Sequence, residues 1–210
     1  MTKMVRARKM KRTIVAALAG CVMATPALSV EDINKDYIRS LAAPGKTVLV
    51  VEYYDGAGKV VDRKGYASAA GYKAVSPTGF KIDEKTTLRL YGVEPCDGDM
   101  VNRKEDFAGS CKEFAERELQ VMLKSAKVLF CRSFVSEQNS PNQNATCYGY
   151  YNYPGSLDSV EMLEDELVSL GALRLAKKPD GTPERSDLDE AQRIGQQGYG
   201  MWADPRVKGQ

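Results

Sequence analysis

The stretch TTLRLYGVEPCDGD, residues 86–99, decides how this sequence is interpreted. Arg89 stands in a run with the apolar, β-branched content of a strand, and the run leads into a turn that carries three acids. The acids are Glu94, Asp97 and Asp99. Alternation along a strand can direct Arg89 into a cleft, where an arginine beside carboxylates suits phosphate chemistry. A solvated acidic turn tied down by Cys96 explains the same residues, and the stretch alone leaves both interpretations open.

Strand-like runs surround this stretch on both sides. They cover residues 47–54, 59–68, 72–82, 84–93, 127–135 and 147–153. The sequence Asp-Gly-Ala-Gly at 55–58 predicts a hairpin turn between the first two runs. The cluster Tyr148, Tyr150, Tyr151 and Tyr153 is typical of a strand with cross-strand aromatic pairs, and a base-stacking platform is the alternative.

Residues 30–45 are typical of a short helix or linker, and clear helical periodicity begins in the second half of the chain. Residues 111–126 repeat apolar positions at helical spacing, with Lys and Glu on the other face. Asp158 with Glu161 makes a capping pattern before a helix whose predicted core face is Leu163, Leu167 and Leu170. Ser186 begins a last helix. These elements predict an α+β fold with a small barrel.

The first 29 residues have the features of an export signal. They hold six Lys and Arg and no acid, followed by an apolar segment with small residues. Cleavage after Ala27 or Ser29 would release a soluble protein, whereas LAGC at 18–21 resembles a lipoprotein box that would make Cys21 a lipid anchor. We therefore expect an exported protein, periplasmic, extracellular or anchored as a lipoprotein, with no transmembrane span in the mature chain.

Charge, histidine and cysteine content limit the possible chemistry. Residues 30–210 keep 24 bases against 28 acids, so net charge gives no support to strong nucleic-acid binding. The chain has no His, which excludes Ser–His and Cys–His nucleophiles within it. Four cysteines outside the signal favour two disulfides, while the absence of a C-x-x-C pair disfavours a zinc site. Four cysteines permit three connectivities.

Four short pieces in order give the sequence a family resemblance. LRLYGVEP, a Tyr-Gly element, ELVSLGAL and DEAQ…YGMW resemble the staphylococcal nuclease (thermonuclease) family over residues 67–204. The resemblance implies an OB-fold, a five-stranded β-barrel with three helices. Residues 30–66 would be an N-terminal extension with a β-hairpin, and residues 205–210 a tail. The exported, four-cysteine branch of that family implies the disulfides Cys96–Cys111 and Cys131–Cys147.

The resemblance also assigns roles to the opening stretch. In active members two Asp bind calcium, two Arg neutralise the phosphoryl group and a Glu activates water. Arg89 matches the first Arg, Glu94 matches a metal-ligand Asp, and Asp97 matches the catalytic Glu. Both carboxylates differ from the family pattern by one methylene, and the neighbouring proline is displaced to Pro95. Calcium would be the cofactor only if the site were active; otherwise none is expected.

Two required groups are missing from the matching positions. The second metal ligand should lie in the turn at 76–79, which reads Ser-Pro-Thr-Gly, and no acid occurs from Arg63 to Ile82. The second Arg should follow Tyr148-Gly149 or, in another register, lie near Asn142, yet residues 133–173 contain no Lys or Arg. The family's base-stacking Tyr residues are also absent, because no aromatic residue lies between Tyr153 and Tyr199.

The sequence therefore predicts an exported protein with a degenerate nuclease site. Its phosphodiesterase activity would be lost or strongly impaired, and it would act as a binding or envelope-associated module, with single-stranded nucleic acid as a weak partner. One alternative is an active or weak endonuclease on DNA or RNA that recruits Lys73 or Lys81 and Asp83. Another is a structural or assembly protein of the cell envelope that uses the hairpin at 46–66.

Overall fold

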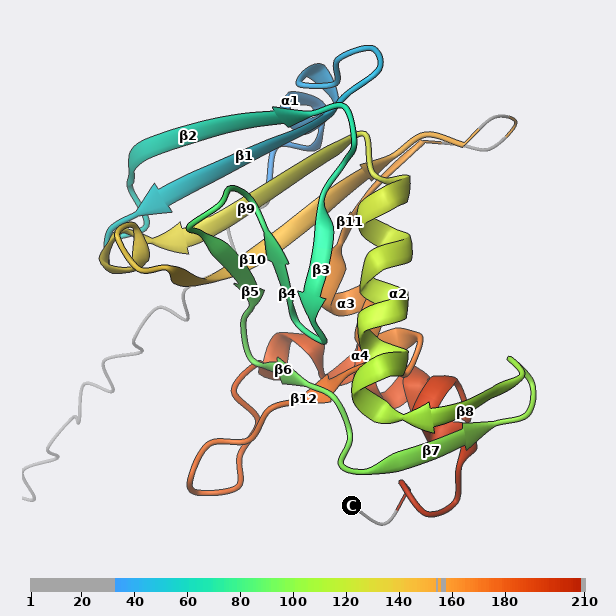
Figure 1. Cartoon of the computed structure of the whole chain (residues 1–210). Coiled ribbons are helices and arrows are strands. Elements are labelled where there is room, and N and C mark those ends of the chain that lie inside the picture. The colour runs from blue at the N-terminus through green and yellow to red at the C-terminus, as the bar shows by residue number, and fades with distance from the viewer. Residues whose placement is uncertain (1–32, 154, 156–157, 209–210) are drawn as a thin grey trace, which may run out of the picture. The chain divides into compact units, whose positions relative to one another are not determined.

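The computed structural model describes residues 33–153, 155 and 158–208. The export signal and the lipoprotein box with Cys21 lie outside the described residues. The described residues from Asn34 onward form one compact unit. This unit is α+β, with a mixed sheet and few helices (Figure 1), as the sequence predicts. Within the described ranges, no helix is both long and apolar enough to cross a lipid bilayer.

The N-terminal hairpin is built into the main sheet. It follows α1 (Lys35–Ser40) and consists of β1 (Thr47–Tyr54) and β2 (Val60–Ser68), which pair antiparallel. The Asp55 carboxylate closes the predicted turn by accepting hydrogen bonds from the N–H groups of Ala57 and Lys59. On its other edge β1 pairs in parallel with β9 (Val128–Phe134). The expected hairpin is thus present and joins the main sheet through β9, and the middle of β1 is buried.

The other strands complete one mixed sheet. β3 (Lys73–Ser76), β4 (Gly79–Lys81) and β5 (Thr87–Leu90) form an antiparallel meander. β10 (Asn142–Tyr151) lies between β5, to which it is parallel, and β9, to which it is antiparallel. The order is β2-β1-β9-β10-β5-β4-β3, with β11 (Ser159–Met162) also on β10. The predicted helix cap at Asp158 and Glu161 is wrong, because this segment pairs as β11.

Helices and short strands cover the remaining apolar surface. α2 (Cys111–Ser125) starts at a capping box in which Ser110 and Glu113 exchange side-chain and backbone hydrogen bonds, and it packs against β3. α3 (Leu163–Ser169) packs against α4 (Asp189–Gly195) and β10. Two small sheets pair β6 (Val93–Glu94) with β12 (Arg174–Leu175) and β7 (Asp99–Asn102) with β8 (Phe107–Ser110). The described 3-10 turns are η1 (Val135–Glu137), η2 (Ser186–Leu188) and η3 (Gly200–Ala203).

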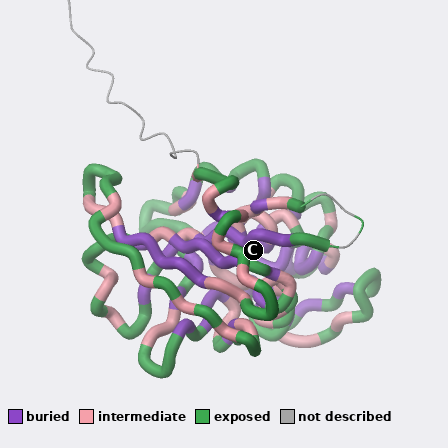
Figure 2. Tube along the Cα trace, turned by 90° about the horizontal axis from the view of Figure 1, so that it is seen from above, coloured by how far each residue is buried: buried purple, intermediate pink, exposed green. Residues whose placement is uncertain are grey.

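The buried residues run along the centre of the sheet and under the helices (Figure 2). Tyr148, Tyr150 and Tyr151 are buried, which supports the strand interpretation of the tyrosine cluster. Leu163 and Leu167 are fully buried as predicted. Leu170 is 44% exposed, because α3 ends at Ser169 and Leu170 is its C-cap residue.

Both predicted disulfides are present. Cys96–Cys111 joins the segment after β6 to the start of α2, with the two Cα atoms 5.4 Å apart. Cys131–Cys147 links directly opposite residues of β9 and β10. Two such bonds are typical of a protein that folds in an oxidising compartment.

We expect the double substitution Cys96→Ala/Cys111→Ala to lower the free energy of unfolding by about 3 kcal/mol. The two cysteines are 15 positions apart, and the disulfide restricts the conformational entropy of this loop in the unfolded chain. Urea unfolding followed by circular dichroism measures the change. A midpoint and slope equal to those of the wild type would contradict a stabilising role for this bond.

Candidate functional site

Arg89 projects from the sheet face opposite the core. It stands on β5 between buried Leu88 and Leu90, and its own side chain is exposed. Its cross-strand neighbours are Gly79 on β4 and Asn144 on β10. Within the described residues no ion pair or hydrogen bond of the Arg89 side chain is found. Arg89 is thus exposed between two buried leucines, as strand alternation predicts, whereas its position in a cleft and its role in phosphate binding stay predictions.

Arg174 brings the two predicted carboxylates together. Its Nε lies 3.0 Å from Oε1 of Glu94, and its Nη2 lies 3.0 Å from Oδ2 of Asp97. The backbone supports this contact, because Arg174 and Glu94 are opposite residues of β12 and β6. The Asp97 side chain is 86% exposed, whereas that of Arg174 is only 16% exposed. The guanidinium is therefore largely buried and pairs with two of the three acids of the turn.

The predicted replacement for the second metal ligand already has structural partners. Asp83, which could have served as a metal ligand, accepts hydrogen bonds at 2.8 Å from the N–H groups of Lys85 and Thr86 and so closes the loop between β4 and β5. The turn at 76–79 is compact: a Cβ atom on Gly79 would lie 2.7 Å from Oγ of Ser76. Among the described residues, no group of three or more His, Cys, Asp or Glu side chains is arranged to hold a metal ion.

Arg185 is a second arginine that the sequence pattern did not reveal. It is 9% exposed and pairs with both carboxylate oxygens of Asp187, at 2.8 and 2.7 Å. Its Nη1 donates to Oγ1 of Thr146 on β10 at 3.1 Å and lies 3.4 Å from the carbonyl oxygen of Tyr91. The same Nη1 is 3.9 Å from Oε1 of Glu164 on α3. This cation thus joins the end of β5, β10, α3 and η2.

Glu164 is the buried acid of this cluster. It is fully buried, and both carboxylate oxygens lie within 3.3 Å of the backbone N–H nitrogen of Cys147. Burial raises the pKa of Glu164 to about 8, although Arg185 and the Cys147 N–H group act in the opposite direction. Glu164 therefore binds a proton in the folded protein at pH values where an exposed glutamate is ionised.

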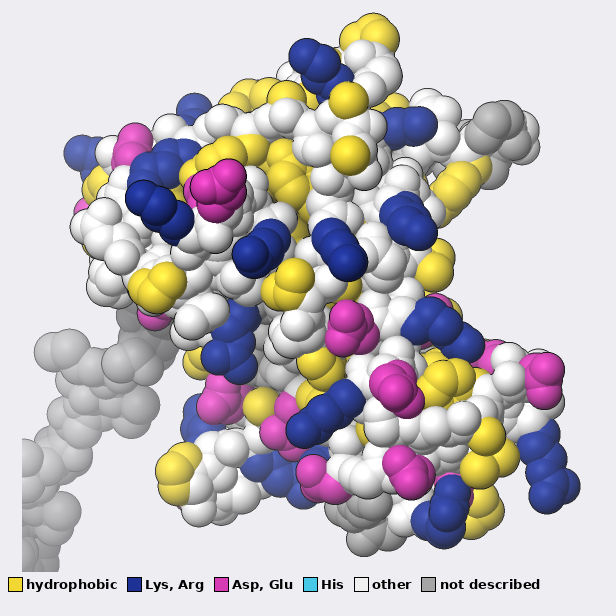
Figure 3. Space-filling view, in the orientation of Figure 1, with side chains coloured by type: hydrophobic (Ala, Val, Ile, Leu, Met, Phe, Trp, Pro, Cys, Tyr) yellow, Lys and Arg dark blue, Asp and Glu magenta, His cyan; other side chains and the backbone are white. Residues whose placement is uncertain are grey.

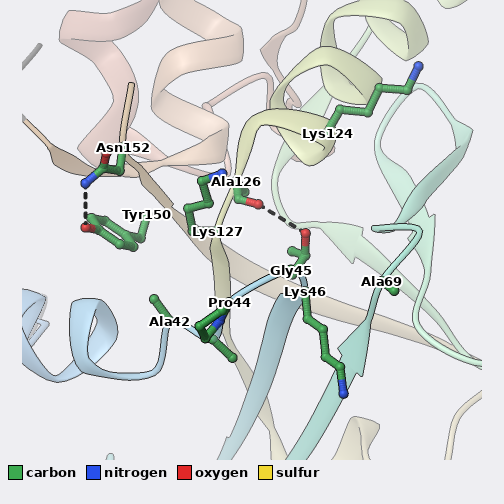
Figure 4. A pocket seen from close by; sticks show the side chains of 12 residues that line it. Ala42, Pro44, Gly45, Lys46, Ala69, Lys124, Ala126, Lys127, Tyr150 and Asn152 are labelled. Atoms are coloured by element: carbon green, nitrogen blue, oxygen red, sulfur yellow. Dashed lines mark hydrogen bonds between the residues drawn. The ribbon is translucent and has the colours of Figure 1, made fainter. Parts of the chain in front are cut away.

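The described cavity of about 450 Å³ lies elsewhere on the unit (Figure 4). It is bounded by residues 42–47, by the end of α2 and by the end of β10. Neither Arg89 nor the acidic turn lines it. Three of its lining side chains are lysines: Lys46, Lys124 and Lys127.

No family model matches this sequence, and no curated protein is similar to it. The resemblance to the staphylococcal nuclease family therefore stays a prediction that depends on the quoted residues alone. The structure itself defines an α+β unit with two disulfides, an exposed arginine on β5 and an acidic turn in which Arg174 pairs with Glu94 and Asp97.

We expect Gly92→Ala to destabilise the fold more than Gly98→Ala. Both glycines have positive φ, +71° and +72°, so each alanine carries a conformational penalty of about 1 kcal/mol. A Cβ atom on Gly92 would also lie 2.4 Å from Cγ of Arg185, whereas one on Gly98 meets nothing within 4 Å. Urea unfolding of the two variants measures the difference. Equal losses of stability would show that close packing on Arg185 is unimportant.

We expect the free energy of unfolding to fall as the pH rises from about 4.5 to about 8, because over this range the folded protein keeps a proton on Glu164 that the unfolded chain releases. Glu164→Gln should flatten this part of the profile. Chemical unfolding between pH 5 and pH 9 provides the measurement, with Glu84→Gln in the exposed β4–β5 loop as control. A Glu164→Gln profile as steep as that of the wild type would contradict the assignment.

Proposed function

We propose that this chain is an exported protein with a staphylococcal-nuclease-like OB-fold, in which calcium-dependent phosphodiesterase activity is lost or strongly impaired. It would act as a binding or envelope-associated module. The observation that carries this proposal is the ion pairing of Arg174 with both Glu94 and Asp97. These are the two carboxylates that a site of this type would need for its metal and its water.

The electrostatics of the acidic turn oppose metal binding. A hard divalent cation binds ionised oxygen ligands. The positive guanidinium of Arg174 lies 3.0 Å from an oxygen of each carboxylate, so it occupies these ligand atoms and also repels an approaching cation. Displacing Arg174 would leave a largely buried cation without these partners, which costs free energy. No carboxylate at 76–79 compensates, since that turn reads Ser-Pro-Thr-Gly.

Several features of the fold are consistent with the proposed OB-type domain. The meander β3-β4-β5 is followed by α2, by the antiparallel pair β9-β10 and by α3 and α4. This gives five main strands and three helices in the order that the family resemblance implies. The hairpin β1-β2 adds to this set on the free edge of β9.

A weak endonuclease is the second candidate, favoured by one observation. Arg185 places a cation against Thr146 of β10 and the carbonyl group of Tyr91, two residues after Arg89. It could supply the positive charge that the Tyr148-Gly149 segment lacks. Its bidentate pairing with Asp187 reduces the charge available to a phosphate, so we rank this candidate second.

Residues 30–210 should cleave neither single-stranded DNA nor RNA above background, with calcium or with chelator. Calcium should leave the melting temperature of the wild type unchanged and raise that of Arg174→Ala, because a ligand held by the folded state stabilises it. Arg193→Ala, which removes an exposed arginine paired with Glu190, is the matched control. Calcium-dependent cleavage by the wild type that Arg89→Ala abolishes would establish the endonuclease instead.

A further inference from the structure

Five exposed lysines form a band across one side of the unit. They are Lys46, Lys73, Lys81, Lys124 and Lys127, and we call them the lysine band. Figure 3 shows Lys and Arg side chains gathered across the upper half of the molecule, over β3, β4 and the end of α2, where few acids interrupt them. In the lower half the two signs of charge are mixed.

The fold makes the lysine band continuous. Lys73 and Lys81 are directly opposite residues of β3 and β4, so their side chains share one face of the sheet. The Gln120 side chain on α2 accepts from the N–H group of Ala74 and donates to the carbonyl oxygen of Tyr72, which fixes α2 beside Lys73. Lys124 stands one turn further along α2 and lines the cavity together with Lys46 and Lys127.

The lysine band lacks local neutralisation. None of its five lysines forms an ion pair within the described part of the chain, and no Asp or Glu lines the cavity. Like charges directly opposite on neighbouring strands, as at Lys73 and Lys81, are destabilising. Since residues 30–210 carry more acids than bases, this positive surface is a local concentration and not a consequence of overall charge.

The arrangement suits an extended anionic surface better than a single small anion. In Figure 4 Lys46 and Lys124 extend away from the cavity in different directions, so their ammonium groups do not converge on one point. The exposed apolar residues among the lysines are aliphatic: Val75 on β3 is 43% exposed and Val121 on α2 is 53% exposed. Exposed clusters of basic residues are attracted to anionic lipid headgroups, with each Lys near the surface adding to the binding free energy.

We infer that the lysine band docks the unit on an anionic phospholipid surface. A nucleic acid fits less well, because stacking successive bases requires several exposed aromatic faces. Phe80 on β4 and Phe114 on α2 are buried, and Tyr153, which follows the cavity-lining Asn152, is an exposed ring that already stacks on Tyr151. The sequence supplies a reason for a second membrane signal. Twelve residues separate Cys21 from Asn34, a span of at most about 45 Å, and a single acyl chain binds membranes only weakly without a basic patch. The inference does not depend on whether nuclease activity is lost.

The test uses residues 30–210, which lack Cys21, in flotation with vesicles of phosphatidylcholine alone or with about one third phosphatidylglycerol. We expect binding to the anionic vesicles only, and its loss at about 0.5 M salt, where exposed charges are screened. Lys73→Gln/Lys81→Gln/Lys124→Gln should reduce the partition coefficient roughly a hundredfold, because each basic residue near an anionic surface contributes about a fivefold factor. The control Lys104→Gln/Lys112→Gln/Lys178→Gln makes the same charge change at exposed sites outside the lysine band.

Equal losses in the two triple variants would overturn the inference, since binding would then follow net charge alone. Binding to neutral vesicles, or none to anionic vesicles, would overturn it too. A lysine-band variant that loses affinity for single-stranded DNA but keeps its affinity for vesicles would assign the surface to nucleic acid instead. Thermal unfolding of each variant confirms that these exposed substitutions leave the fold intact. The cleavage and calcium assays are separate, so failure here leaves the proposed function standing.

Discussion

The buried guanidinium of Arg185 is the interaction on which the arrangement of the unit depends. A buried charge is tolerated only with partners, and Arg185 finds them on η2, β10 and α3. Asp187 is the ionised partner of this cation, and its loss would leave the buried charge of Arg185 without compensation. The C-terminal helices are thus held against the sheet by a polar contact as well as by apolar packing.

This contact also determines the local sequence around it. Gly92 follows the carbonyl group that Arg185 approaches, and only a residue without Cβ fits there. On β10, Thr146 accepts from Arg185, and the next residue, Cys147, combines a disulfide with a hydrogen bond to Glu164. Two adjacent residues of β10 thus make a side-chain hydrogen bond, a disulfide and a backbone hydrogen bond to three different elements. The path of β10 beside β5 is fixed by them, and with it the place of Arg89.

Local patterns in the sequence predicted the α+β class, the turn at Asp55, α2 and the strand of buried tyrosines, because each depends on residues close together along the chain. The parallel pairing of β1 with β9 could not be predicted in this way, since a strand's periodicity does not specify its partner. The ion-pair partners of Arg174 and Arg185 could not be predicted for the same reason, since Arg174 and Glu94 are 80 residues apart in the sequence. The family resemblance supplied both disulfide pairings, which counting cysteines had left open.

Arginine and lysine have different electrostatic roles in this molecule. Arginine presents a planar fork suited to bidentate pairing, and here Arg174 and Arg185 use it to neutralise carboxylates within the fold. Lysine is a hydrated point charge on a flexible stem, and the lysine band leaves such charges exposed and without counter-ions among the described residues. A surface that repels itself is kept only at a cost in stability. Two carboxylates of the acidic turn therefore have an internal counter-charge in Arg174, whereas the inferred role of the lysine band requires an anion outside the chain.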